Sequence, residues 1–239
     1  MEYEKTSIVK YYKYLSEKMG LWNSEAYIFN NYISKDSKIL DLGCGIGRTT
    51  FGLYNIGFKK IIGLDISQKM IDICKEKCKS RKIKDLEFIC GDAEKLNFES
   101  NIFDCVFFSF CGLMTINKEQ KRIRVFQETN RVLKNKGLFI FTTYDREKNV
   151  EYLDYWKKEK IKWDNNKHNK KYEKFGDRIC NNSLNGKFIH VPIYKEVEKI
   201  CNNSNYKIIW SGLRSQICNE PQHVIELSDD CIFYIAQKY

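Results

Sequence analysis

The sequence predicts an α/β protein in which a largely parallel β-sheet is covered by helices on both faces. Short, nearly continuous apolar runs alternate with helical patterns through the first 145 of the 239 residues, as is typical of strands buried on both faces. A glycine-rich turn directly follows the first run, and acidic residues stand where successive runs end. These three features predict a binding site at the carboxyl edge of one sheet.

The first 145 residues contain five expected strands and three expected helices. Ser67 is a suitable N-cap for the second helix, and Gly137 is expected to stop the third helix and open the fifth strand. The strands are expected at 38–42, 60–66, 86–90, 103–108 and 138–143, and the helices at 48–55, 67–81 and 118–134.

The pattern changes after the fifth strand. Residues 146–174 are highly charged with little periodicity and are expected to be a surface insertion. Asn185-Gly186 separates two strand-like runs, 179–184 and 187–191, and predicts a β-hairpin because both turn residues need a positive φ. A helix after Pro192 and strands at 206–210 and 231–236 complete the expected elements.

Composition excludes several classes of protein. Hydrophobic residues make up 43% of the chain, charged residues 30%, and there are only 2 prolines, which excludes disordered and low-complexity chains. No apolar run approaches the ~20 residues that span a bilayer, and the first residues lack the pattern of a signal peptide. We therefore expect a cytoplasmic protein without a membrane partner.

The cysteines and the charge each leave two interpretations open. The ten cysteines include no C-x-x-C pair, so we expect buried thiols and no metal, with metal or redox chemistry as the alternative.

The net charge of +10 includes a basic run at 75–84. That run is either a solvated helix face or part of a surface for nucleic acid.

The glycine turn, 43–47, reads Gly-Cys-Gly-Ile-Gly and is followed by Arg48. Glycines after a strand let the backbone turn sharply and approach a ligand closely. A dinucleotide fingerprint, G-x-G-x-x-G, requires glycine where Arg48 stands. The spacing therefore favours a nucleoside that carries a short zwitterionic arm.

Acidic residues end the next two strands. Asp65 stands where a carboxylate can accept hydrogen bonds from both ribose hydroxyls, and Asp92 stands where it can accept one from an exocyclic adenine amine. Alone, either aspartate could be a helix cap. Together with Asp41 on the first strand, they favour a nucleoside site.

On these residues the sequence resembles the class I S-adenosylmethionine-dependent methyltransferases, most closely the small-molecule subgroup of ubiquinone and sugar biosynthesis. The resemblance covers about residues 36–145, and the usual Pro-Gly-Gly of its last block is Asn135-Lys136-Gly137 here. It implies a Rossmann-like fold with a seven-stranded sheet whose last strand is antiparallel, and S-adenosylmethionine as cofactor, with S-adenosylhomocysteine as product. The blocks that carry it are 40–47, 63–67, 91–93, 103–106 and 128–137.

The resemblance also implies which residues bind the cofactor and how the chain is divided. Gly43, Gly45 and Gly47 would hold the methionine arm with Asp41 close to it, Asp65 the ribose, and Asp92 with Ala93 the adenine; Cys44, Ile66 and Ser109 are expected there as well. We expect a single domain, 1–239. It comprises N-terminal cap helices (1–35), a cofactor-binding core (36–145), a lid or insertion with a hairpin (146–191), and a C-terminal helix and strands (192–239).

The acceptor side is expected beyond the fourth strand, where Phe110 and Cys111 would form the wall. Neither an Asn/Asp-Pro-Pro-Tyr block nor a proline before Cys111 is present, which disfavours both common nucleobase methylations. Two covers are available: an aromatic N-terminal segment, or the insertion with its hairpin. The N-terminal segment could equally pack on the sheet edge. The covering side chains would be Tyr11, Tyr14 and Trp22 in the first and His168 in the second.

An acceptor that loses a proton needs a base. His190 is the preferred candidate and Tyr144 the second, with His168 and Asp145 also placed after the fifth strand or in the insertion. The alternative for His190 is a structural histidine at the base of the hairpin.

The preferred function is methyl transfer to a small-molecule oxygen or nitrogen acceptor by in-line displacement. RNA methylation, including cap methylation, is the alternative because of the basic charge, and protein methylation or a non-catalytic cofactor-binding module are further ones. The sequence leaves the oligomeric state open.

Overall fold

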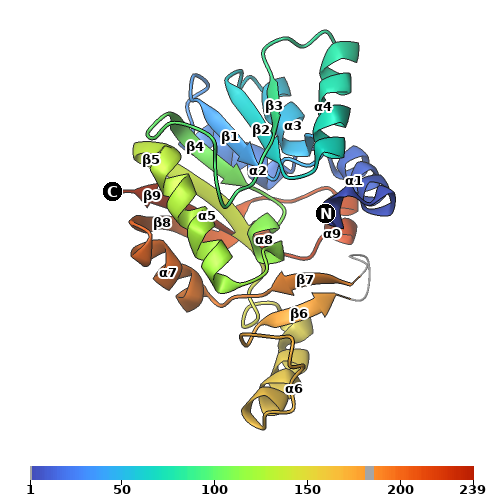
Figure 1. Ribbon diagram of the computed structural model, residues 1–239, viewed down its shortest axis with the longest axis vertical. Coiled ribbons are helices and arrows are strands. Elements are labelled where there is room, and N and C mark those ends of the chain that lie inside the picture. The colour runs from blue at the N-terminus through green and yellow to red at the C-terminus, as the bar shows by residue number, and fades with distance from the viewer. Residues whose placement is uncertain (1, 181–185) are drawn as a thin grey trace.

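The computed structural model describes residues 2–180 and 186–239 and contains one central sheet of seven strands (Figure 1). Its strand order is β3-β2-β1-β4-β5-β9-β8. Only β9 runs antiparallel to its neighbours, β5 and β8, so the predicted fold class is confirmed. The strands are β1 (Ile39–Leu42), β2 (Ile61–Asp65), β3 (Glu87–Cys90), β4 (Phe103–Phe108), β5 (Leu133–Thr143), β8 (Tyr206–Leu213) and β9 (Ile232–Lys238).

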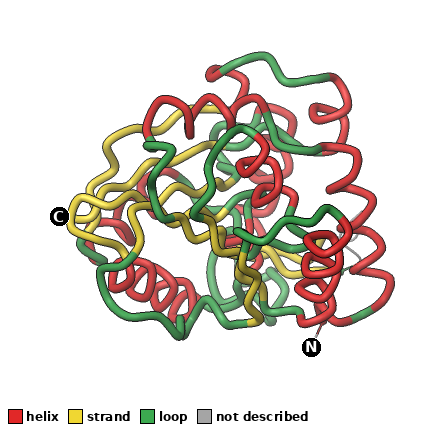
Figure 2. Tube along the Cα trace, turned by 90° about the horizontal axis from the view of Figure 1, so that it is seen from above, coloured by secondary structure: helices red, strands yellow, loops and turns green. Residues whose placement is uncertain are grey.

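Helices cover both faces of this sheet because successive strand residues point to opposite sides. Ile39 belongs to the core on the side of α2 (Asn23–Tyr32), α3 (Arg48–Asn55) and α4 (Gln68–Ser80), whereas Leu40 belongs to the core under α5 (Glu119–Val132) and α7 (Tyr194–Asn203). Figure 2 shows the strands between helices when the molecule is seen from above. All parallel strands thus end at the same edge, where loops are free to form a site.

The N-terminal segment consists of η1 (Glu2–Glu4), α1 (Thr6–Met19) and α2. Two short helices near the C-terminus, α8 (Arg214–Ile217) and α9 (Gln222–Leu227), were not expected from the sequence, and α9 contacts α1 (Figure 1). Glu220 accepts hydrogen bonds from the backbone N–H groups of Asn23 and Ser24, each at 2.9 Å. The two ends of the chain therefore support each other beside the carboxyl edge of the sheet.

The insertion contains more structure than its sequence predicts. It holds η3 (Val150–Tyr152) and α6 (Leu153–Asp164), a helix on which Trp156 is the one buried side chain. Because a single buried ring gives no apolar stripe, the periodicity could not show this helix. Trp156 and Trp163 both contact the ring of Phe175, which fixes α6 on the following loop.

The expected hairpin is present as a separate pair of strands, β6 (Asp177–Cys180) and β7 (Lys187–His190). Gly186 has the positive φ, +76°, that the turn prediction requires, whereas Asn185 lies outside the described residues. In Figure 1 the hairpin lies between α6 and the main sheet.

One predicted boundary is wrong. Leu133 already pairs with Phe103, so β5 begins there and α5 ends at Val132. The register shifts between this pair and Cys105–Leu138, and Lys136 has a φ of +63°. Gly137 therefore lies within an irregular strand and does not terminate the helix. A bulge interrupts the alternation of apolar and polar residues, so the sequence pattern does not indicate this part of the strand.

All ten cysteines are free thiols, and all but Cys90 and Cys218 are buried or nearly so. No helix among the described residues is long and apolar enough to cross a membrane.

Candidate functional site

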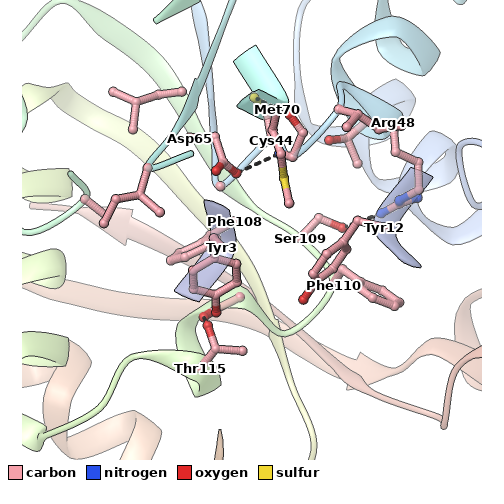
Figure 3. Close-up of a pocket in the computed structure, with 18 of the residues that line it drawn as sticks. Tyr3, Tyr12, Cys44, Arg48, Asp65, Met70, Phe108, Ser109, Phe110 and Thr115 are labelled. Carbon is pink, nitrogen blue, oxygen red and sulfur yellow. Dashed lines mark hydrogen bonds between the residues drawn. The ribbon is translucent and has the colours of Figure 1, made fainter. Parts of the chain in front are cut away.

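A cavity of about 330 Å³ opens at the carboxyl edge of the sheet (Figure 3). The turn after β1 and the ends of β2, β3 and β4 form its floor, and η1 and α1 cover it. The lining residues predicted from the sequence are Gly43, Cys44, Gly45, Asp65, Ile66, Asp92, Ala93, Ser109 and Phe110. Tyr12 belongs to the aromatic N-terminal segment expected as a cover, whereas Tyr3, Leu15 and Met19 were not predicted there. Segments far apart in sequence thus meet at the predicted edge.

The glycine turn approaches the cavity closely because its glycines adopt conformations that other residues avoid. Gly43 has a φ of +66°, and a Cβ atom there would lie 2.6 Å from the ring of Phe108. Gly45 has a φ of +55°, and its N–H donates to Oδ2 of Asp65 at 2.8 Å. The turn is thereby tied to the end of the neighbouring strand.

Asp65 faces the cavity from the end of β2. Its Oδ1 accepts from the backbone N–H of Ser67 at 2.9 Å, so each carboxylate oxygen holds one backbone donor. Burial raises the pKa of this carboxyl, and the two backbone bonds oppose that effect. Each oxygen retains a lone pair for a further donor such as a ligand hydroxyl.

Asp92 and Ala93 line the same cavity at the end of β3. Oδ1 of Asp92 accepts from the backbone N–H of Glu94 at 2.9 Å, which fixes the side chain in a short turn. Asp65 and Asp92 therefore lie on one cavity wall, as the spacing of their strands predicts.

Asp41 and Gly47 do not line this cavity. Asp41 is 1% exposed, and its Oδ2 accepts from the hydroxyls of Thr49 and Thr50, both at 2.5 Å. Burial raises its pKa to about 6. Asp41 thus holds the first turn of α3 beneath the glycine turn, and Thr49, not Asp41, reaches the cavity wall.

A buried ion pair, which was not predicted from the sequence, joins the N-terminal segment to the site. Both terminal guanidinium nitrogens of Arg48 donate to Glu25, at 2.6 and 2.7 Å, and Ser109 donates to the same carboxylate. The ring of Trp22 lies 4.9 Å from the guanidinium and packs under the site without lining it. Figure 3 shows Arg48 reaching toward Ser109. An acidic residue in the first turn of a helix usually does no more than stabilise the positive end of the helix dipole. Glu25 was therefore not singled out from the sequence.

A second cavity, of about 260 Å³, adjoins the first. Tyr12, Phe110 and Thr115 line both, and the predicted wall residue Cys111 lines the second. Aromatic and charged residues both line this cavity. Besides Tyr12 and Phe110, the aromatic residues are Tyr11, Tyr144, Tyr152 and Trp156, and the charged ones are Asp145, Arg178, Glu226 and Asp229.

His190 lies away from both cavities. Its Nδ1 is 2.7 Å from Oδ1 of Asp177, and its Nε2 is 3.7 Å from Glu196. It lines a separate space of about 70 Å³. These contacts at the base of the hairpin favour the alternative prediction, a structural histidine.

Of the other predicted acceptor-side residues, some line a cavity and others do not. Tyr144 lines the second cavity, and burial raises the pKa of its phenol. His168 stacks on Trp163 in the insertion at 3.9 Å, and Tyr14 is 53% exposed. Neither His168 nor Tyr14 lines either cavity.

Part of the chain is similar in sequence to known methyltransferases. Residues 39–137 match a family model described as a methyltransferase domain. The "Ubiquinone/menaquinone biosynthesis C-methyltransferase UbiE" of Wigglesworthia glossinidia brevipalpis is 37% identical over 99 residues, 40% of this chain and 39% of that protein. The demethylmenaquinone methyltransferase of Lactococcus lactis is 42% identical over 101 residues, 41% of this chain and 38% of that one. This chain therefore matches about two fifths of the length of these curated relatives.

Solved structures extend the similarity of fold to nearly the whole chain. A SAM-dependent methyltransferase from Methanosarcina mazei superposes with a TM-score of 0.70 and 21% identity, covering 92% of this chain and 99% of that one. The [4+2]-cyclase SpnF superposes with a TM-score of 0.63 and 15% identity, covering 90% and 80%. Because a cyclase shares the fold, the fold alone does not define the reaction. Residues 39–137 therefore match the methyltransferase-domain family model, and nearly the whole chain shares the Rossmann-like fold of these solved structures.

Proposed function

We propose that the protein transfers a methyl group from S-adenosylmethionine to an oxygen or nitrogen atom of a small molecule held in the second cavity. One observation carries the proposal: the two cavities share the wall residues Tyr12, Phe110 and Thr115. A cofactor in the first cavity and an acceptor in the second would therefore meet at this shared wall, which in-line transfer requires.

The residues of the first cavity fit the cofactor. Asp65 offers two carboxylate oxygens to ribose hydroxyls, and Asp92 with Ala93 lies where the adenine is expected. The close approach at Gly43 leaves backbone, not side chain, against the methionine arm. When bound, the sulfonium supplies an electrophilic methyl group.

The chain's own contribution is to position the acceptor and exclude water. Residues of α1, among them Tyr12, cover the shared wall, and the ion pair of Arg48 and Glu25 holds the segment that follows α1 against the glycine turn. Because burial raises the pKa of Tyr144, its phenol is a hydrogen-bond donor at neutral pH. We infer that Tyr144 orients the acceptor and does not act as its base.

The second cavity favours a small molecule over RNA. Among its described lining residues, Arg178 is the one cation and three are carboxylates, whereas a surface for nucleic acid gathers several cations around the phosphates. The relatives with matching sequence are named as methyltransferases of quinone biosynthesis, and one as a C-methyltransferase. Carbon is therefore the alternative acceptor atom.

The test uses methyl-labelled S-adenosylmethionine, the purified protein and a desalted extract of the source cells. The small molecules removed by desalting are added back to that extract. Products are separated by size before and after nuclease digestion, and Asp65→Asn, assayed below saturating cofactor, serves as the control with weakened cofactor binding. We expect label in the small-molecule fraction, and mass spectrometry then identifies the methylated atom. Label in a nuclease-sensitive polymer or in protein would overturn the proposal. Cofactor binding without any consumption would instead indicate a non-catalytic module.

A further inference from the structure

The second cavity contains a cation without a carboxylate partner. Arg178 lies on β6 and is half-buried, and its Nε is buried with no hydrogen-bond partner among the described residues. Two other buried arginines differ in this respect: Arg48 is paired with Glu25 and Arg146 with Glu196, each at 2.6 Å. An unpaired buried donor costs free energy unless a ligand satisfies it.

Three aromatic rings lie close to the Arg178 guanidinium. The guanidinium carbon lies 5.0 Å from the ring centre of Tyr155, 5.9 Å from that of Trp156 and 6.0 Å from that of Tyr152. Such ring contacts are electrostatic and supply no oxygen acceptor to the guanidinium N–H groups. The polar side chain beside the guanidinium is the Cys180 thiol, whose sulfur is only a weak acceptor. Those N–H groups form the fork that binds a carboxylate through two parallel hydrogen bonds.

The acidic residues of the cavity do not neutralise this cation. Asp145 is committed to the backbone, because its two oxygens accept from Glu147 at 2.7 Å and Tyr194 at 2.9 Å. Asp229 accepts from the hydroxyl of Tyr152 at 3.2 Å, and Glu226 is exposed and accepts from Gln222. The segment 181–185, which lies outside the described residues, contains no Asp or Glu in its sequence.

We propose that Arg178 binds an anionic oxygen group, of carboxylate type, on the methyl acceptor, so that the acceptor is a small anionic molecule with an aromatic or apolar body. This inference rests on the proposed function, since it assumes that the second cavity receives the acceptor. The aromatic wall accommodates the body, and Arg178 fixes which end of the molecule points away from the cofactor cavity. That cavity is reached through the shared wall at Tyr12 and Phe110.

The experiment measures binding of three matched probes to the full chain saturated with S-adenosylhomocysteine. Benzoate is the anion, benzamide its neutral counterpart and benzylamine the cation, and calorimetry with ligand-observed NMR gives each affinity. We expect benzoate to bind best. Arg178→Gln should weaken benzoate about tenfold or more, the loss of one charge-assisted contact, while leaving benzamide unchanged. The affinity of Arg178→Lys for benzoate should lie between those of the natural chain and Arg178→Gln. Lysine keeps the positive charge but lacks the paired N–H donors of the guanidinium.

Asp229→Asn is the control variant. It removes a negative charge from the same wall without touching Arg178, so benzoate should bind this variant at least as tightly as the natural chain. Benzylamine binding best and losing affinity in Asp229→Asn would overturn the proposal in favour of a cationic acceptor. Equal benzoate affinity in Arg178→Gln, or no benzoate binding to the natural chain, would also overturn it.

These outcomes are separable from a failure of the proposed function. A chain that does not bind S-adenosylhomocysteine, or that never transfers label, contradicts the proposed function whatever the probes do. If Arg178→Gln transfers label to a neutral or cationic acceptor at the rate of the natural chain, only the proposed role of Arg178 is contradicted.

Discussion

Asp41→Asn isolates the energetic cost of a buried charge beneath the glycine turn. Asp41 is fully buried, and burial raises its pKa to about 6 from an ordinary value of 3.8. Because the folded pKa lies above the unfolded one, the carboxyl's contribution to stability is fully present below the unfolded value and is lost as the pH rises through about 6. A shift of about 2 units corresponds to about 3 kcal/mol at 1.36 kcal/mol per unit.

Asparagine at this position imitates the neutral carboxyl. Both threonine hydroxyls donate to the same oxygen, Oδ2, so the amide oxygen can accept both bonds. The difference in free energy of unfolding, variant minus natural chain, should therefore rise by up to about 3 kcal/mol between pH 4 and pH 7.5. Urea unfolding at matched ionic strength over this range measures the difference directly.

Asp104→Asn is the matched control, with the opposite sign. Partial burial opposes the change, but hydrogen bonds from the Lys134 side chain and the Lys38 backbone hold the pKa of Asp104 below its usual value. Its stabilisation is present above the unfolded pKa and is lost as the pH falls, so this variant should lose stability at neutral pH. A flat difference between Asp41→Asn and the natural chain across the pH range would refute the conclusion that burial controls the ionisation of Asp41.

Three other substitutions test the site. Asp65→Asn should raise the Kd for S-adenosylhomocysteine about tenfold or more, because the amide turns a donor toward one of two backbone N–H groups; calorimetry giving an unchanged Kd would exclude the ribose role. Glu25→Gln should destabilise the fold by about 3 kcal/mol or more in urea by leaving Arg48 buried and uncompensated, and a loss well under 1 kcal/mol would show that the pair does not anchor the cap. Gly43→Ala should cost about 1–3 kcal/mol, because a positive φ is strained in alanine and its Cβ would meet Phe108; an unchanged Tm and cofactor affinity would contradict the close-approach argument.

The sequence predicted which strand ends meet at the first cavity because that arrangement follows from local structure, while the binding of a cofactor there stays a prediction. Gly43, Gly45, Asp65 and Asp92 lie at the ends of successive parallel strands, and strand order alone brings such ends to one edge. The error at Gly137 has the opposite origin, because it depends on contacts between distant segments. A bulge in β5 is set by its pairing with β4, and no spacing along the chain encodes it.

His190 shows why the surroundings of the acceptor-side candidates could not be predicted from the sequence. A histidine after a hairpin strand satisfies the sequence criteria for a base, but its role depends on which carboxylates face it, and these come from β6 and α7. Glu25 and Arg178 were missed for the complementary reason. Each has an ordinary sequence context and gains its importance only from a distant partner or, for Arg178, from the lack of one.

The acceptor cavity also limits what net charge can say about function. The chain carries a net charge of +10, which taken alone favours a polyanionic partner. The cavity, however, is lined by residues of α1, of the loops after β4 and β5, of β6, and of α9 and the segment after it. Its described lining residues include three acids and one cation. Exposed charges are screened over about 8–10 Å at physiological salt, so an acceptor inside this cavity experiences Arg178 and Asp229 far more than the lysines of the outer surface. Selection among acceptors therefore depends on the arrangement of these few groups, and the surface charge affects at most how fast an anionic acceptor arrives.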